Sequence, residues 1–215
     1  MDALKALMDT PQLLALAGAL GWASGFRLYA VLFLTGAAGY MGWVPLPSGL
    51  HLLQHPAMLA ASGFMFAVEF FADKIPFVDT IWDMVHTAIR IPAGAALAAA
   101  ALGADNATIT SVAALLGGTL AATAHATKMT TRAAANLSPE PFSNVAISLF
   151  EDGLVIGIFW LANNYPLAFG ITLGIAVLLM VTILIVLMRF LKQVFRRVSG
   201  FFTGAPVLNA GAGKF

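Results

Sequence analysis

The sequence predicts an all-α integral membrane protein of about six transmembrane helices. Hydrophobic residues make up 60% of the 215 residues and charged residues only 10%, and the mean hydropathy is +0.89. A soluble domain has roughly a quarter of its residues charged, so this chain could not cover its surface in water. The apolar blocks reach the roughly 20 residues that cross a bilayer core as a helix, and they lack the alternation of a membrane β-barrel.

Turn-forming residues divide the apolar sequence into six predicted spans. Proline, glycine and asparagine separate the blocks because they interrupt helices or favour turns. We predict helices over residues 13–40, 57–72, 78–102, 107–134, 142–162 and 167–188. The segment 41–56 is predicted as an interfacial loop, in which His51 and His55 are loop residues and not metal ligands. Residues 1–12 are then a cytoplasmic N-terminus, 13–190 the membrane domain and 191–215 a basic, glycine-rich tail.

The first span is predicted to be broken within residues 21–27, GWASGFR. Glycine weakens a helix, and an arginine at this depth is costly unless it is paired or wetted. The pairs Gly21/Gly25 and Gly153/Gly157 have the four-residue spacing that lets helices approach closely. We expect these contacts within one chain, with a seam between two copies as the alternative.

Lysine and arginine predict the orientation. The loops 41–56, 103–106 and 163–166 contain neither residue, whereas the opposite side collects Lys5, Lys74, Arg132, Arg189, Lys192, Arg196 and Arg197. By the positive-inside rule both termini should face the cytoplasm, as an even number of spans requires. Three spans followed by three also suggest two inverted three-helix repeats.

Charged residues inside the spans give the strongest functional indication. Asp79, Asp83, His86 and Arg90 recur at spacings that place them on one face of a helix, and His125, Lys128, Arg132 and Asn136 do the same on a later span. We expect these groups to converge on a buried site that binds a substrate or ion. The candidate residues are Arg27, Glu69, Asp73, Asp79, Asp83, His86, Arg90, His125, Lys128, Arg132, Glu151 and Asp152.

The charges in this set nearly balance once Lys74 is included. An isolated charge at the bilayer centre costs about 2.5–3.5 kcal/mol, so mutual pairing lowers the cost of burial. Purely structural ion pairs between helices are the alternative. Asp73 and Lys74 could instead be solvated in a cytoplasmic turn, and Lys128 and Arg132 could extend to the membrane surface.

Three segments resemble a small bacterial membrane family catalogued only as a domain of unknown function. They are EFFADKIPFVDTIWDMVHTAIRIPAGA (69–95), HATKMTTRAAANLSPEPFSN (125–144) and SLFEDG (148–153). The resemblance covers most of residues 15–190. It implies a compact multi-span protein of the bacterial inner membrane and brings no activity, substrate or cofactor.

A weaker similarity is to cation exchangers with a Glu-x-Gly-Asp-Lys/Arg motif in each of two inverted halves. Here the stretch from Glu69 to Lys74 has one extra residue and no glycine, and Glu151-Asp152-Gly153 lacks the basic residue.

These observations favour a transporter or channel for a small ion or polar solute, with its site between two three-helix halves. One alternative is a non-enzymatic scaffold or assembly subunit whose buried charges only hold helices together. An intramembrane enzyme acting on lipid through His86 or His125 is the other, but no nucleophile motif supports it.

We therefore expect no enzyme activity and no cofactor, leave a metal undetermined, and expect membrane lipid and a small ion or solute as partners. The absence of cysteine excludes thiolate sites, and the net charge of +1 argues against nucleic acid.

Overall fold

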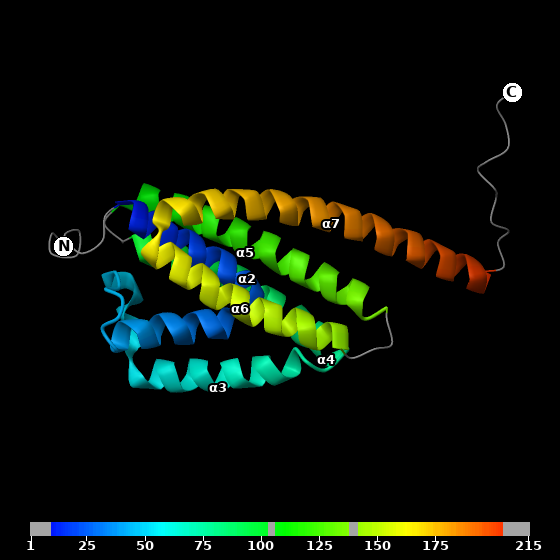
Figure 1. Cartoon of the computed structure of the whole chain (residues 1–215), viewed down its shortest axis with the longest axis horizontal. Coiled ribbons are helices and arrows are strands. Elements are labelled where there is room, and N and C mark those ends of the chain that lie inside the picture. Colours follow the sequence, from blue (N-terminus) through cyan, green and yellow to red (C-terminus); the bar gives the residue numbers. More distant parts are fainter. Residues whose placement is uncertain (1–9, 103–105, 138–141, 204–215) are drawn as a thin grey trace, which may run out of the picture.

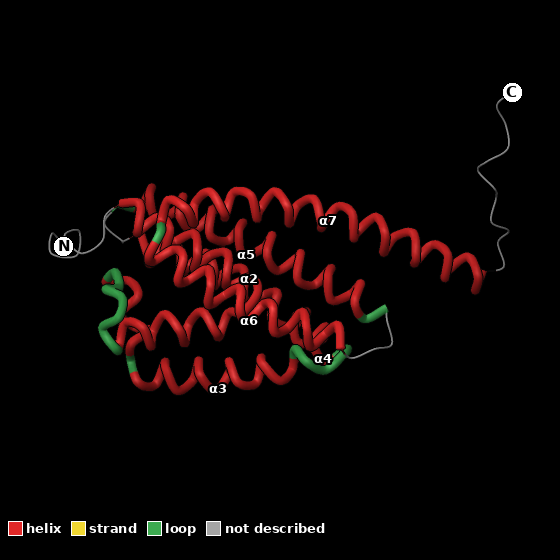
Figure 2. Tube along the Cα trace, in the orientation of Figure 1, coloured by secondary structure: helices red, strands yellow, loops and turns green. Residues whose placement is uncertain are grey.

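The structure, a computed structural model, is a bundle of long helices. It describes residues 10–102, 106–137 and 142–203, with side chains up to residue 196, and within these it contains no strand (Figure 2). The helices are α2 (Thr10–Tyr40), the short 3-10 helix η1 (Ser48–Gln54), α3 (Pro56–Ala72), α4 (Val78–Leu102), α5 (Ala107–Ala135), α6 (Phe142–Asn164) and α7 (Pro166–Thr203). Five of them are long and apolar enough to cross a membrane, or six if the bent pair of η1 and α3 counts as one span. The predicted all-α membrane fold and the six predicted helical segments are confirmed.

Helix α7 is longer than the span predicted from the sequence. It continues to Thr203, so the beginning of the predicted tail is helical. A helix of 38 residues is roughly 57 Å long, well beyond the ~30 Å of a bilayer core. The predictions for Lys5, for the rest of residues 1–9 and for 204–215 fall outside the described residues, and so does the side chain of Arg197.

Helix α2 folds back on itself at Arg27. The Arg27 backbone, at φ −143° and ψ 77°, lies outside helical values, and the half-helices on either side run in opposite directions (Figure 1). Leu14 lines a pocket with Leu167 at the start of α7, and Ala38 lines another with Asn164 at the end of α6. Both ends of α2 therefore lie at the same end of the bundle, and Arg27 is the tip of a helical hairpin.

The break in the first span was predicted, but the reversal was not. Glycine and arginine signal an interruption without fixing the direction of the chain that follows. With α2 returning to its starting side, α3 to α7 alternate in direction, and Thr10 and Thr203 lie at opposite ends of the molecule (Figure 1). The prediction that both termini face the cytoplasm rested on the distribution of lysine and arginine and on an even number of crossings. The fold of α2 removes the second of these supports.

Small residues bring three helices into backbone contact beside the hairpin. A Cβ added at Gly21 of α2 would lie 2.7 Å from the Cα of Gly117 in α5, and one at Gly94 of α4 would lie 2.6 Å from the Cβ of Ala121. The predicted contact through Gly21 and Gly25 within one chain is confirmed.

The second glycine pair is not packed in this way. No atom of the described chain lies within 4 Å of a Cβ built at Gly153 or Gly157. The expectation that a neighbouring helix approaches this part of α6 closely is therefore wrong for the described chain.

The packing predicts different effects of two glycine substitutions. Gly25→Ala would place a methyl group 2.6 Å from the Ala124 Cβ and against the Ala121 carbonyl, so it should destabilise the fold by about 1–3 kcal/mol. Gly157→Ala meets open space and should be neutral or stabilising, because alanine favours helix. Thermal unfolding of both variants in the same detergent measures the difference, and equal stabilities would contradict the packing of α2 on α5.

Candidate functional site

Buried charged side chains from five helices form one continuous ion-pair network around the tip of α2. Almost all of them are less than 5% exposed, and the exceptions are Asp152 and Lys74, at 15% and 19%. The acids are Glu69, Asp73, Asp79, Asp83, Glu151 and Asp152, and the bases are Arg27, Lys74, Arg90, Lys128 and Arg132.

Asp73 is the centre of this network. Its Oδ2 lies 2.6 Å from Lys128 Nζ, 2.8 Å from Arg27 Nη1 and 3.7 Å from Arg132 Nη2. Its carbonyl also accepts a hydrogen bond from Arg132 Nη1 at 2.5 Å. The alternative that Asp73 is solvated in a cytoplasmic turn is wrong, because α5 and the α2 tip cover the end of α3.

Lys74, the next residue, occupies the partly exposed edge of the network. Its ammonium lies 3.0 Å from the centroid of the Phe70 ring and 3.7 Å from Asp152 Oδ2, and it donates to Ser148 Oγ at 3.2 Å. Burial lowers the pKa of Lys74 below that of a free lysine, although the Asp152 carboxylate opposes the shift. The turn between α3 and α4 is thus the part of the network nearest to solvent.

Arg27 fixes the tip of α2 to α6. Its Nε lies 3.2 Å from Asp152 Oδ1, and its Nη2 donates to the Ser148 hydroxyl at 2.8 Å and to the Ser148 carbonyl at 3.1 Å. The ammonium of Lys128 donates to the carbonyl of Phe26 at 3.1 Å. A cation therefore sits at the carboxyl end of the first half-helix, where backbone carbonyls lack helical partners and the helix dipole is negative.

Arg90 links α3 and α4 at the other side of the network. Its Nη2 lies 2.5 Å from Glu69 Oε1, and its Nη1 lies 2.6 Å from Asp83 Oδ1. The same Asp83 oxygen lies 3.1 Å from Lys128 Nζ. The predicted polar faces of α4 and α5 therefore meet, and Asp83 is shared between their cations.

The contacts of His125 fix it as a neutral side chain. Its Nδ1 lies 3.3 Å from Arg90 Nη1, and because a guanidinium can only donate, this nitrogen accepts. The proton is then on Nε2, which lies 2.8 Å from Thr87 Oγ1, and the Thr87 hydroxyl donates in turn to the Asp83 carbonyl at 3.0 Å. His125 supports the position of Arg90 without adding charge.

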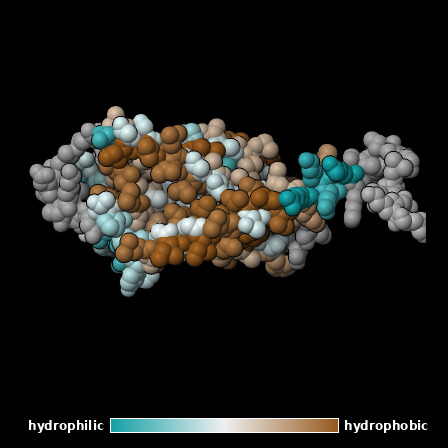
Figure 3. Space-filling view, turned by 90° about the horizontal axis from the view of Figure 1, so that it is seen from above, coloured by the Kyte–Doolittle hydropathy of each residue, from teal (hydrophilic) through white to brown (hydrophobic). Residues whose placement is uncertain are grey.

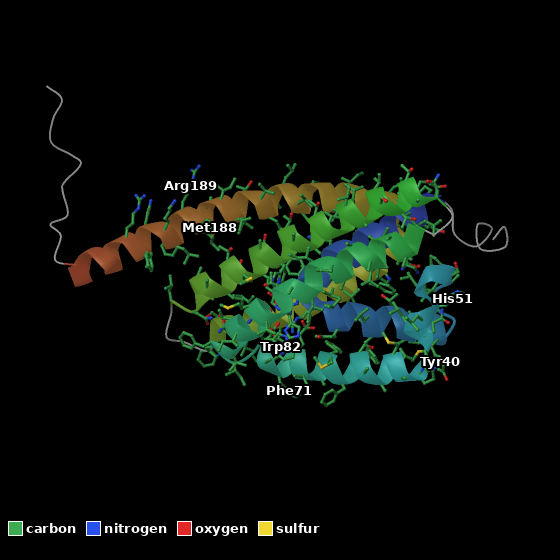
Figure 4. The ribbon with its side chains drawn as sticks, turned by 180° about the vertical axis from the view of Figure 1, so that it is seen from behind. Tyr40, His51, Phe71, Trp82, Met188 and Arg189 are labelled. Carbon is green, nitrogen blue, oxygen red and sulfur yellow. The ribbon has the colours of Figure 1, made fainter. Side chains whose placement is uncertain are left out.

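His86 lies beside the network and not in it. Its Nδ1 lies 2.7 Å from the Trp82 carbonyl and its Nε2 3.2 Å from the Tyr29 hydroxyl, while its ring stacks on Trp82 at 4.1 Å between centroids. Figure 4 labels Trp82 on α4, above the end of α3 marked by Phe71. His86 was predicted as a site residue, and its described partners are instead aromatic and backbone groups.

Arg132 connects the end of α5 to α6 and α4. Its Nη2 lies 2.8 Å from Glu151 Oε2 and its Nη1 3.6 Å from Asp79 Oδ2. Asn136 donates to Asp79 Oδ1 at 3.3 Å and accepts from Asn144 at 2.7 Å. Because Arg132 is fully buried, as Lys128 is, the alternative that the two extend to the membrane surface is wrong.

The network holds more carboxylates than cations. The six acids face five bases, so its formal charge is −1 when all are ionised. Glu69 and Asp79 each have one cation within 4 Å among the described residues, Arg90 for Glu69 and Arg132 for Asp79, whereas each of the other acids has at least two. Glu69 Oε2, Asp73 Oδ1 and Asp83 Oδ2 are buried without any hydrogen-bond partner there.

Sequence reasoning identified all of these charged residues but missed neutral side chains that connect them. Ser148 contacts both Arg27 and Lys74, and Asn144 bonds to Asn136. Both lie on the face of α6 that carries Glu151, one and two turns earlier, so helical spacing was the available signal. Within the described chain, no group of three or more histidine or acidic side chains is placed to hold a metal ion.

A family model described as a domain of unknown function (DUF4126) matches residues 14–188, a range that includes the whole network. No curated protein and no solved structure matches the chain. The family predicted from the three charged segments is confirmed.

The network predicts that its cations differ in their contribution to stability. Arg27→Gln removes the nearest cation of Asp152 and one of the three cations around Asp73, and breaking a buried pair costs about 3–5 kcal/mol. Lys74→Gln removes a partly exposed cation and should cost no more than about 1 kcal/mol. Thermal unfolding in detergent compares the two, and an Arg27 variant as stable as the Lys74 variant would contradict the central role of the tip.

Proposed function

Because the chain belongs to the DUF4126 family, whose description assigns no activity, we propose from the geometry that it is a membrane transporter for a small cation. The ion-pair network around the α2 tip is the proposed site. The surplus carboxylate is the observation that carries this proposal.

A buried network of charges is costly unless its charges are compensated. With six acids and five bases, the network has a formal charge of −1, and one more positive charge would bring it to zero. A proton or a small monovalent cation supplies that charge. Glu69 is the site we assign to that charge, because Arg90 is the one described partner of its carboxylate and its Oε2 is buried without a hydrogen bond. Asp79 also has one cation, but its carboxylate accepts further hydrogen bonds from the Thr80 N–H and from Asn136. Such a cation competes with Arg90 for Glu69, so its arrival and departure change the pairing between α3 and α4.

The hairpin of α2 supports transport because broken helices are a recurrent element of transporter sites. Half-helix ends present unpaired backbone groups to ions near the middle of the membrane, and irregular backbone at this depth is tolerated only inside protein. Here the break places Arg27 and the Phe26 carbonyl against the network. Any cation that alters the charges of Asp73 or Glu69 also alters the attraction that holds the tip.

We propose a bacterial inner membrane as the location, with the basic end of the molecule in the cytoplasm. Lys74, Arg189 and Lys192 lie at the end of the bundle opposite η1 and the α6–α7 turn, and the positive-inside rule favours the cytoplasm for that end. The hairpin of α2 then enters from the other side. Helix α3 runs opposite to α6, and α4 runs opposite to α7, as an inverted repeat requires. The repeat itself stays a prediction.

A scaffold with structural ion pairs is the competing function, and a flux measurement separates the two. Purified protein is reconstituted into liposomes that contain a pH-sensitive dye, and proton movement is followed after a gradient of Na⁺ or K⁺ is imposed. The proposal predicts cation-dependent proton flux, or direct Na⁺ or K⁺ flux recorded with an ion-sensitive dye.

The variant Glu69→Gln should reduce this flux to the level of protein-free liposomes, because it removes the surplus carboxylate. Thr119→Val, a substitution of similar size at an exposed position of α5 outside the network, is the control and should behave as the wild type. Absence of proton, Na⁺ and K⁺ flux from folded wild-type protein would refute the cation transporter and favour the scaffold.

A further inference from the structure

A groove lies between the end of α5 and the second half of α7, away from the ion-pair network. It has a volume of about 870 Å³, and its walls are formed by Leu137 after α5 and by α7 side chains that include Leu184, Met188 and Leu191. Arg189 and Lys192 complete its lining. We propose that this groove binds an anionic phospholipid, with the phosphate on Arg189 and Lys192 and an acyl chain along the apolar wall.

The groove exists because α7 extends beyond the end of α5. Helices α5 and α7 run in the same direction and pack together, but α5 ends at Ala135 while α7 continues to Thr203 (Figure 1). Figure 4 labels Met188 and Arg189 where α7 passes the end of α5. Large apolar side chains are left uncovered there, with Met188 55% and Phe195 74% exposed.

The basic residues lie at the level of the lipid phosphates. A span of about 20 residues that starts at Pro166 reaches the membrane surface near the position of Arg189. Arg189, Lys192 and Arg196 follow at spacings that form one stripe, and the space-filling view shows hydrophilic surface at this end of α7 next to apolar surface (Figure 3). Clusters of basic residues beside a transmembrane helix attract anionic lipids.

Charge complementarity separates this ligand from other occupants of the groove. Among the described residues, the lining contains no acidic side chain, and neither Arg189 nor Lys192 forms an ion pair. A second copy docked through the same face would bring two basic stripes together, because a two-fold interface pairs each patch with itself. A zwitterionic lipid would fill the apolar wall but add no net charge opposite the two cations.

Native mass spectrometry of the full chain in detergent tests the proposal, with added phosphatidylglycerol and phosphatidylcholine of identical acyl chains as the probes. The wild type should bind phosphatidylglycerol more tightly. Arg189→Gln together with Lys192→Gln should weaken phosphatidylglycerol binding by roughly fivefold per charge, about 25-fold in all, and leave phosphatidylcholine binding unchanged. Inorganic phosphate alone should not compete, because it lacks the acyl chain.

A second pair of variants tests the apolar wall without changing charge. Met188→Trp fills the groove and should displace the lipid, whereas Val186→Trp, at an equally exposed position of α7 outside the lining, should not. Equal affinity for the two lipids, insensitivity to both sets of variants, or full competition by inorganic phosphate would overturn the proposal. So would a dimer that shows no lipid preference and is broken by Met188→Trp, since the groove would then hold a second copy.

Discussion

The attraction between the Asp73 carboxylate and three cations holds the rest of the structure in place. Arg27 comes from the tip of α2, and Lys128 and Arg132 come from α5. All three side chains are fully buried. A buried charge without a partner destabilises a protein by several kcal/mol, so the chain positions that supply these cations are tightly constrained. The reversal of α2 is tolerated because Arg27, where the backbone leaves the helical conformation, forms ion pairs with buried carboxylates.

Much of the network was predictable from the sequence. Side chains three, four and seven positions apart share one face of a helix, so the polar stripes on α4 and α5 could be assigned from the sequence alone. Charged residues in apolar helices also turn inward or pair, which predicted that the stripes converge. Asp83, Arg90 and Lys128 meet as this reasoning requires.

The remaining features depend on contacts between distant segments. Asp-Lys-Ile-Pro after α3 has the composition of an exposed turn, and the residues that bury Asp73 lie more than fifty positions away on α5. Local sequence likewise marked the break in α2 but could not give its direction. Gly153 and Gly157 illustrate the converse, since their spacing suits a close helix contact that no described segment provides.

The charge count bears on why the network has this composition. A purely structural network gains nothing from a sixth carboxylate, because glutamine at Glu69 could still accept from Arg90 without adding a charge. Retaining an ionisable group in a buried site at the expense of stability is typical of functional residues, since selection for stability alone would remove it. The same reasoning separates Glu69 from Asp73, whose charge is compensated three times over. Stability accounts for Asp73, and the cation that we propose as the transported ion would account for Glu69.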